Sequence, residues 1–181
     1  MMEDLSLHIF DVVENAVAAG ATRVRIAVNE NERRDVLTIR VADNGRGMPP
    51  EVRKRALDPF FTTGRKRTGL GLPLLAQAAR QSDGDLALES APGRGTTVVA
   101  RFRYSHLDRQ PLTKMARTML ALVVGHPDVE FGYRHRRNGR DFTFASGPYF
   151  GKAGRPAGVD PRVVGAMRRA LEAGLKRIGT T

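Results

Sequence analysis

Two hydrophobic periods alternate along the first part of the chain, and they predict a helix followed by a pair of strands. Residues 5–19 carry apolar side chains at helical spacing and end before Gly20, which predicts an amphipathic helix. Residues 22–29 and 36–42 instead alternate apolar and other side chains with a period of two. This alternation predicts an antiparallel hairpin with one apolar face, on which we expect the helix to pack.

Glycine and proline then mark a loop, after which the same sequence of elements returns. Residues 43–50 (DNGRGMPP) predict a loop that leads into a short charged helix ending at about Leu57. Residues 69–82 predict a glycine turn opening into a helix, and residues 85–90 and 96–104 predict two more strands. The order predicts an α+β fold, a two-layer α/β sandwich with helices on one face of a mixed, mainly antiparallel sheet.

The last part of the chain predicts a helix, two strands and a second helix. A helix follows Pro111 and ends at about Val124, and the final helix covers residues 161–177. Between them, Asn138-Gly139 is typical of a tight hairpin turn. The aromatic residues of this hairpin are expected to share one face with Val129 and to form a small core; they are Phe131, Tyr133, Phe142 and Phe144.

Charge divides the chain at about the same place as this change of pattern. Residues 1–100 hold 14 Lys and Arg against 13 Asp and Glu, whereas residues 101–181 hold 16 against 6. We therefore expect a first domain at residues 1–104 and a basic extension of unknown role at residues 105–181, with the boundary near Tyr104–Pro111. The basic positions are Arg134, His135, Arg136, Arg137 and Arg140 at the hairpin, and Arg168, Arg169, Lys176 and Arg177 on the last helix.

Composition and charge restrict the classes of partner. A concentrated positive field favours nucleic acid, acidic proteins or acidic membrane surfaces, but a solvated basic surface explains the extension better. No apolar run approaches the ~18 residues of a membrane helix, and the first twenty residues contain four acidic side chains, unlike a signal peptide. We expect a cytoplasmic protein without a membrane partner. The absence of cysteine excludes disulfides and thiolate metal sites.

The first predicted helix carries the earliest candidate for chemistry. Asp11 and Asn15 are four residues apart and share a helical face with His8. A carboxylate and an amide oxygen side by side suit Mg²⁺, which takes few protein oxygens and completes its shell with phosphates and water. The carboxylate is alternatively a base that orients a water. Taken alone, this spacing is better explained as the solvated side of an amphipathic helix.

The DNGRGM loop is a second candidate. Asp43 stands at the end of a predicted strand, where its carboxylate can accept a hydrogen bond from an amine such as that of adenine. Gly45 and Gly47 allow a positive φ and a close approach of the backbone. The alternative is an ordinary Asp-Asn-Gly turn in which Asp43 only caps the following segment.

A third candidate is the TGLGL segment at residues 68–72. Glycine-rich backbone at a helix N-terminus presents free N–H groups that attract phosphate, and the cations Arg65, Lys66 and Arg67 precede it. The spacing fits neither the Walker nor the dinucleotide-binding fingerprint. The structural alternative for these glycines is close packing of a helix on a sheet.

The three motifs together, in this order, resemble the Bergerat-fold (GHKL) ATPases. That group includes gyrase, the large heat-shock chaperone, the histidine kinases and the mismatch-repair ATPases, and the histidine-kinase type is the most similar. The matching positions are Asp11 before Asn15-Ala16, DNGRG at 43–47, DPFFTT at 58–63, TGLGL at 68–72 and GRGT at 93–96. The resemblance covers residues 5–103.

The resemblance implies that the chain binds ATP with Mg²⁺, and it implies a role for each matching residue. Asn15 would bind Mg²⁺ together with the phosphates, Asp43 would accept the adenine amine, and Thr96 would support a water near adenine. Gly47 would leave room for the base. The other implied nucleotide-site residues are Gly45, Met48, Lys66, Thr68, Gly69, Leu70, Gly71 and Leu72, of which Gly69 and Gly71 would cradle phosphate.

Departures from the family pattern affect the expected activity. Asp11 stands where gyrase-like members carry a glutamate base, so hydrolysis is in question. None of the histidines begins the HExxxP phosphoacceptor motif. We expect a signal-transduction kinase that acts in trans on a His or Ser/Thr of a partner protein, as stand-alone anti-sigma-factor kinases do. The alternatives are a non-catalytic ATP-responsive binding module and, more weakly, an ATP-gated nucleic-acid binder.

Overall fold

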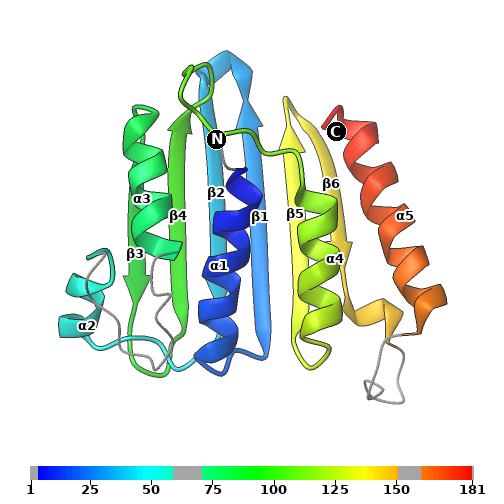
Figure 1. The fold of residues 1–181 in the computed structure, drawn as a ribbon, viewed down its shortest axis with the longest axis horizontal. Helices are drawn as coiled ribbons and strands as arrows, with labels where there is room; N and C mark the ends of the chain where they lie inside the picture. The colour runs from blue at the N-terminus through cyan, green and yellow to red at the C-terminus, as the bar shows by residue number, and fades with distance from the viewer. Residues whose placement is uncertain (1–3, 59–70, 151–159, 181) are drawn as a thin grey trace.

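A single six-stranded sheet, covered by helices on one face, organises the chain (Figure 1). The computed structural model describes residues 4–58, 71–150 and 160–180. The strands are β1 (Arg23–Asn31), β2 (Val36–Asp43), β3 (Asp85–Ser90), β4 (Thr96–Arg103), β5 (Glu130–Arg137) and β6 (Arg140–Ala145). The helices are α1 (Leu5–Ala18), α2 (Pro50–Arg55), α3 (Gly71–Gln81), α4 (Met115–Gly125) and α5 (Pro161–Ile178), with 3₁₀ turns at Glu32–Arg34 and Gly147–Tyr149. The predicted α+β sandwich is confirmed.

The sheet continues from residues 1–104, the part that carries the ATPase-like motifs and is called the ATPase-like segment below, into the basic extension at residues 105–181. Its strand order is β3-β4-β2-β1-β5-β6, and every neighbouring pair is antiparallel except β1 and β5, which are parallel. In the register, Ile26 of β1 lies between Val41 of β2 and Tyr133 of β5. Residues far apart in the sequence therefore share one hydrogen-bonded core.

Strand alternation decides which side chains are buried. Val24, Ile26 and Val28 lie under the helices and are at most 1% exposed, as their spacing predicts. The expected aromatic core of the second hairpin is also confirmed, with Phe131 fully buried. Its turn has positive φ at both Asn138 (48°) and Gly139 (84°), as a type I′ turn requires.

His135 does not belong to the exposed basic cluster in which the sequence analysis placed it. The same alternation that buries Phe131 and Tyr133 turns His135 inward, and its exposed fraction is 0%. Arg134 and Arg136, on the opposite face, share the carboxylate of Asp141. Part of the positive charge of the hairpin is therefore neutralised within the hairpin.

Residues on either side of α4 bind the two ends of α1. Asp4 caps α1 by accepting from the Ser6 amide at 2.9 Å, and its second oxygen accepts from the amide and the hydroxyl of Thr113 at 3.0 and 2.7 Å. At the other end, Glu14 pairs with His126, the residue that directly follows α4. The position of α1 in the structure thus depends on the extension.

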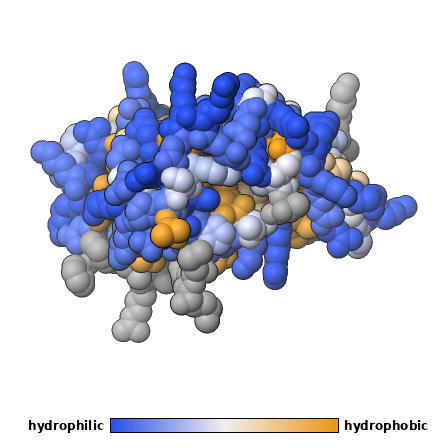
Figure 2. Space-filling model, turned by 90° about the horizontal axis from the view of Figure 1, so that it is seen from above, coloured by the Kyte–Doolittle hydropathy of each residue, from blue (hydrophilic) through white to orange (hydrophobic). Residues whose placement is uncertain are grey.

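The surface is mainly hydrophilic. Seen from the end at which α1 begins and α5 ends, long hydrophilic side chains cover most of the molecule, and hydrophobic residues emerge in small patches (Figure 2). Within residues 4–58, 71–150 and 160–180, every helix is too short or too polar to cross a bilayer.

Candidate functional site

Two of the predicted motifs meet at one end of the sheet. The loop after β2 and the turn between β3 and β4 lie together at the α2 end, whereas the start of α3 lies further along the sheet, against α1 (Figure 1). The register explains part of this arrangement, because Ala42 at the end of β2 pairs with Thr97 at the start of β4. Asp43 and Thr96, the adjoining residues, are therefore brought together although 53 positions separate them.

The Asp43 carboxylate is fixed in orientation by the backbone. Its Oδ1 accepts from the amide of Gly45 at 2.8 Å and from the amide of Thr96 at 3.3 Å. Among the described residues, no hydrogen bond reaches Oδ2. Burial raises the pKa of Asp43, and the two amide bonds oppose that shift. The result is a partly desolvated carboxylate with one oxygen held and the other available to a ligand donor.

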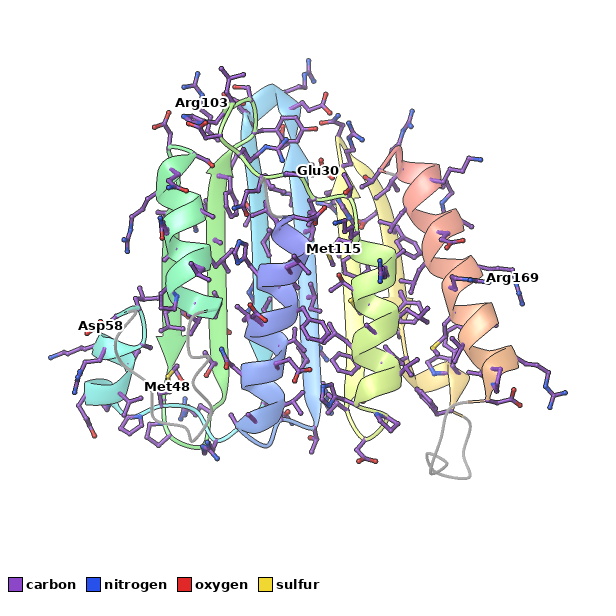
Figure 3. The ribbon with its side chains drawn as sticks, in the orientation of Figure 1. Glu30, Met48, Asp58, Arg103, Met115 and Arg169 are labelled. Atoms are coloured by element: carbon purple, nitrogen blue, oxygen red, sulfur yellow. The ribbon has the colours of Figure 1, made fainter. Side chains whose placement is uncertain are left out.

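Ser90 joins the parts of the site, and the sequence analysis missed it. Its hydroxyl accepts from the amide of Met48 at 2.8 Å, lies 3.0 Å from the carbonyl of Gly95 and is 2.9 Å from the hydroxyl of Thr96. With the Ser90 proton given to Gly95, Thr96 donates to Ser90 and keeps its lone pairs for another donor such as water. Met48 lies beside α2 at the lower end of β3 (Figure 3).

The signal that would have identified Ser90 is its register. Ser90 and Thr96 are direct partners across the β3–β4 hairpin, so a strand prediction with the correct pairing places Ser90 beside the GRGT motif. No motif marks the serine itself. Its role becomes visible only when the hairpin is closed.

Two glycines are required for the loops to close around Asp43. Gly47 has φ +67°, and a Cβ there would lie 1.9 Å from the carbonyl oxygen of Ala91. Gly95 has φ +73°, and a Cβ there would lie 2.0 Å from the carbonyl oxygen of Asp43. Side chains at either position would separate the two loops.

Gly45 is required only because the backbone there approaches Ala19 and Asp43 closely. The positive φ that the sequence analysis allowed there is absent, because positive φ is found at Gly47 and not at Gly45. A Cβ at Gly45 would stand 3.1 Å from the side chain of Ala19 and 3.0 Å from Asp43 Oδ1. Asn44 has a structural role: its Oδ1 accepts from the amides of Thr22 and Arg23 at 3.0 and 2.8 Å, which ties the loop to β1.

Helix α3 begins directly against Asp11 of α1. A Cβ at Gly71 would lie 2.7 Å from the Cβ of Asp11, so glycine permits the approach. Asp11 and Asn15 are exposed beside this junction, whereas Leu72 packs partly buried against the core. The other predicted phosphate-site residues, Lys66, Thr68, Gly69 and Leu70, lie outside the described residues.

His8 does not share the exposed face of Asp11. It is 3% exposed, and its Nε2 lies 3.0 Å from Oε1 of Gln110, which follows the last strand of the ATPase-like segment. His8 lies three residues before Asp11, which places it at the edge of the buried side of α1, where the segment that contains Gln110 covers it.

The donors at this end of the sheet fit a magnesium nucleotide. Asn15 supplies an amide oxygen and Asp11 a carboxylate, which are hard ligands of the kind that Mg²⁺ takes. No group of three His, Cys, Asp or Glu side chains within residues 4–58, 71–150 and 160–180 forms a ready-made metal site.

Comparisons with known proteins point to the same chemistry. Residues 3–106 match the family described as histidine kinase-, DNA gyrase B-, and HSP90-like ATPase. Sensor protein kinase FleS of Pseudomonas aeruginosa is 44% identical over 88 residues, which are 49% of this chain and 22% of that protein. Signal transduction histidine-protein kinase AtoS of Escherichia coli is 36% identical over 96 residues, which are 52% of this chain and 16% of AtoS. The chain thus spans less than a quarter of the length of these two relatives.

One solved structure extends the likeness in fold beyond the matched segment. The crystal structure of the N-terminal domain of a DNA repair protein aligns with a TM-score of 0.56 and 14% sequence identity. The alignment covers 79% of this chain and 52% of that chain. At this level of identity the likeness concerns the fold alone.

Proposed function

This chain belongs to the family of histidine kinase-, DNA gyrase B-, and HSP90-like ATPases, and from that premise we propose that it binds ATP with Mg²⁺ and passes the γ-phosphate to a partner protein. In this proposal, residues 1–104 hold the nucleotide and residues 105–181 contribute to the choice of partner. The kinase names of two relatives support phosphate transfer, and the acceptor we propose is a His or Ser/Thr of another protein.

The observation that carries the proposal is the fixed Asp43 carboxylate. Oδ1 is occupied by two backbone amides at 2.8 and 3.3 Å, so Oδ2 is aimed rather than free to rotate. A partly buried acceptor in this state favours a neutral amine donor such as the 6-amino group of adenine. The lone pairs of Thr96, one strand away, would accept from a water that completes the contacts of the base.

The phosphate end of the proposed site lies where α1 meets α3. Asn15 would bind Mg²⁺, which when bound would neutralise the charge of the phosphates and hold them in line. The backbone N–H groups of Gly71 and Leu72, at the N-terminus of α3, would donate to the same phosphates. We assign the remaining phosphate contacts to Lys66, Thr68 and the residues of TGLGL.

A second function, an ATP-responsive binding module, is favoured by one observation at the same place. Asp11 is shorter than the glutamate base of hydrolysing members, and its Cβ stands 2.7 Å from the position of a Cβ built on Gly71. A carboxylate on a chain one methylene shorter reaches less far toward a water that would attack the γ-phosphate. We expect low hydrolysis without a partner in either case.

Nucleotide titration by calorimetry, with and without Mg²⁺, tests the site. Asp43→Asn should abolish ATP binding, and Asn15→Ala should remove mainly the Mg²⁺-dependent part. Asp108→Asn, at an exposed turn remote from the loops, is the matched control and should bind as the parent does. Unchanged ATP affinity in Asp43→Asn would refute the site.

Phosphate transfer distinguishes the two functions. The purified chain is incubated with γ-labelled ATP, alone and with lysate, and the Asp43→Asn variant is run in parallel. Label that moves onto a lysate protein with the parent chain but not with the variant supports the kinase. Tight binding without transfer or phosphate release supports the module.

A further inference from the structure

A half-open groove of about 670 Å³ lies between α4 and α5, away from the proposed nucleotide site. Its floor is apolar and includes Ala116 and Leu120 of α4 and Leu175 of α5. Pockets of this size and composition are typical of binding sites. The groove lies apart from the packing of the two helices on the sheet, because the sheet-facing sides of both helices are buried through other residues, such as Met119 and Leu171.

Cations stand on both walls of the groove. Lys114, just before α4, and Arg117 of α4 line one wall, and Arg168 and Lys176 of α5 line the other, against a single acidic residue, Glu172. Within the part of the chain that the structure describes, none of these four cations has a carboxylate close enough for an ion pair, whereas three of the hairpin arginines do. Among the described residues, the positive charge of the two walls is therefore not neutralised by ion pairs.

The spacing of the lining residues indicates the shape of a ligand that would fit the groove. On α4 they run from Ala116 to Leu120, which corresponds to about 6 Å of helix, and Thr113 and Lys114 add to the wall just before it. The two helices run antiparallel (Figure 1), and Arg168 and Lys176 are separated by about 12 Å along α5. Charges distributed along both walls fit a ligand that carries negative charge along its length. A lipid with one anionic head group would need cations gathered at one end.

We propose that the groove between α4 and α5 docks an acidic amphipathic helix of a partner protein. The apolar stripe of that helix would lie on Leu120 and Leu175, and its flanking acidic residues would face the cations of the two walls. A second copy of this chain does not offer that surface through the same groove, since α4 has no acidic residue and α5 has only Glu172.

Fluorescence anisotropy with designed peptides tests this proposal on the full chain. One labelled peptide of 18 residues carries a leucine stripe flanked by glutamates, and its matched control carries lysines in place of the glutamates. We expect the acidic peptide alone to bind, with an affinity that falls as salt is added. The double variant Arg117→Glu, Lys176→Glu should lower this affinity roughly tenfold or more, because like charges then face each other.

Two control variants separate the groove from the rest of the molecule. Arg80→Glu makes the charge change of one of these substitutions, or of Arg168→Glu, at an exposed position of α3 and should leave peptide binding unchanged. Asp43→Asn should also leave it unchanged, so failure of the nucleotide proposal is distinguishable from failure of this one. Circular dichroism verifies folding, and the exposed single change Arg168→Glu carries the test if the double variant does not fold.

Several results would overturn the proposal. They are failure of the acidic peptide to bind, equal binding of both peptides, and unaltered binding in the groove variants. Vesicles containing phosphatidylserine are the remaining probe. If they compete with the peptide and lose affinity in the same variants, the groove recognises an anionic membrane surface and the helix proposal is wrong.

Discussion

Glu30 of β1 and His135 of β5 form a buried pair, with Oε1 of the glutamate 2.6 Å from Nε2 of the histidine. The other ring nitrogen of His135 lies 2.6 Å from the hydroxyl of Tyr133. Glu30 lies toward the end of the sheet where α1 begins, opposite the proposed nucleotide site (Figure 3). The pair thus joins the ATPase-like segment to the extension across the parallel β1–β5 junction.

Removal of one partner of this pair should be costly. In His135→Ala the buried Glu30 carboxylate loses its histidine partner and keeps the longer contacts with Arg137 at 4.0 Å and Thr180 at 3.4 Å, and we expect the free energy of unfolding to fall by about 3–5 kcal/mol. The double variant Glu30→Leu, His135→Leu replaces the pair by apolar side chains and should recover much of that loss. Urea unfolding measures both. A loss below about 1 kcal/mol in His135→Ala, the range of an exposed ion pair, would show that the junction does not depend on this pair.

Acid should destabilise the chain through Glu30 and Asp4. Burial raises the pKa of Glu30, but the bond and charge of His135 outweigh it and hold the pKa below its ordinary value of 4.5. Burial likewise raises the pKa of Asp4, but bonds from Ser6 and Thr113 bring it below 3.8. Lowered carboxyl pKa values contribute stability that is present above the ordinary pKa and lost as pH falls through the folded pKa.

The measurement is the free energy of unfolding between pH 3 and pH 7. We expect it to decline as pH falls below about 4.5, and Thr113→Val, which removes the hydroxyl bond to Asp4, should make that decline smaller. An identical acid decline in Thr113→Val and the parent would remove the Asp4–Thr113 contact as a source of stability.

Asp43 should have the opposite effect on the pH dependence of stability. Its pKa is raised in the folded chain by burial, so its contribution to stability is present below the ordinary value of 3.8 and is lost as pH rises through the folded pKa. Asp43→Asn removes the desolvated charge and can keep both bonds to Oδ1. We expect the variant to be as stable as the parent at neutral pH, or more stable, while it loses ATP binding. Thermal unfolding without nucleotide detects this, and a marked destabilisation would mean that Asp43 is a structural residue.

Ser90→Ala should connect stability to nucleotide affinity. The change leaves the Met48 amide and the Gly95 carbonyl without their hydroxyl partner, at a cost of about 1–3 kcal/mol. Because the same hydroxyl orients Thr96, ATP affinity should fall as well. Ser105→Ala, where the hydroxyl bonds Asp35 at an exposed turn, is the control and should leave affinity unchanged. Loss of stability without loss of affinity would restrict Ser90 to a structural role.

Local periodicity was sufficient to predict the helices, the strands and the loop that carries Asp43. Each depends on neighbours within a few residues, and the predicted ranges differ from the observed ones mainly at the ends. The parallel junction of β1 with β5 was not predicted, since its partners are about a hundred residues apart and no local pattern encodes it. Ser90 was missed because its partners Gly95 and Thr96 depend on the register of the β3–β4 hairpin, which no motif marks. His135 was misread because it was grouped with its charged neighbours although the strand alternation turns it inward, and its partner Glu30 is 105 residues away.

The contact between Gly71 and Asp11 gives the sharpest test of how α3 is placed. Alanine is favoured over glycine in a helix by about 1 kcal/mol, so Gly71→Ala alone would be expected to stabilise α3. The added Cβ would stand 2.7 Å from the Cβ of Asp11, however, which forces α1 and α3 apart. We therefore expect lower stability and weaker ATP binding. Gly125→Ala, at the end of α4 with nothing within 4 Å of its Cβ, is the matched control and should change neither property in that direction. Equal behaviour of the two variants in thermal unfolding and nucleotide titration would mean that the start of α3 need not lie against α1 for ATP to bind.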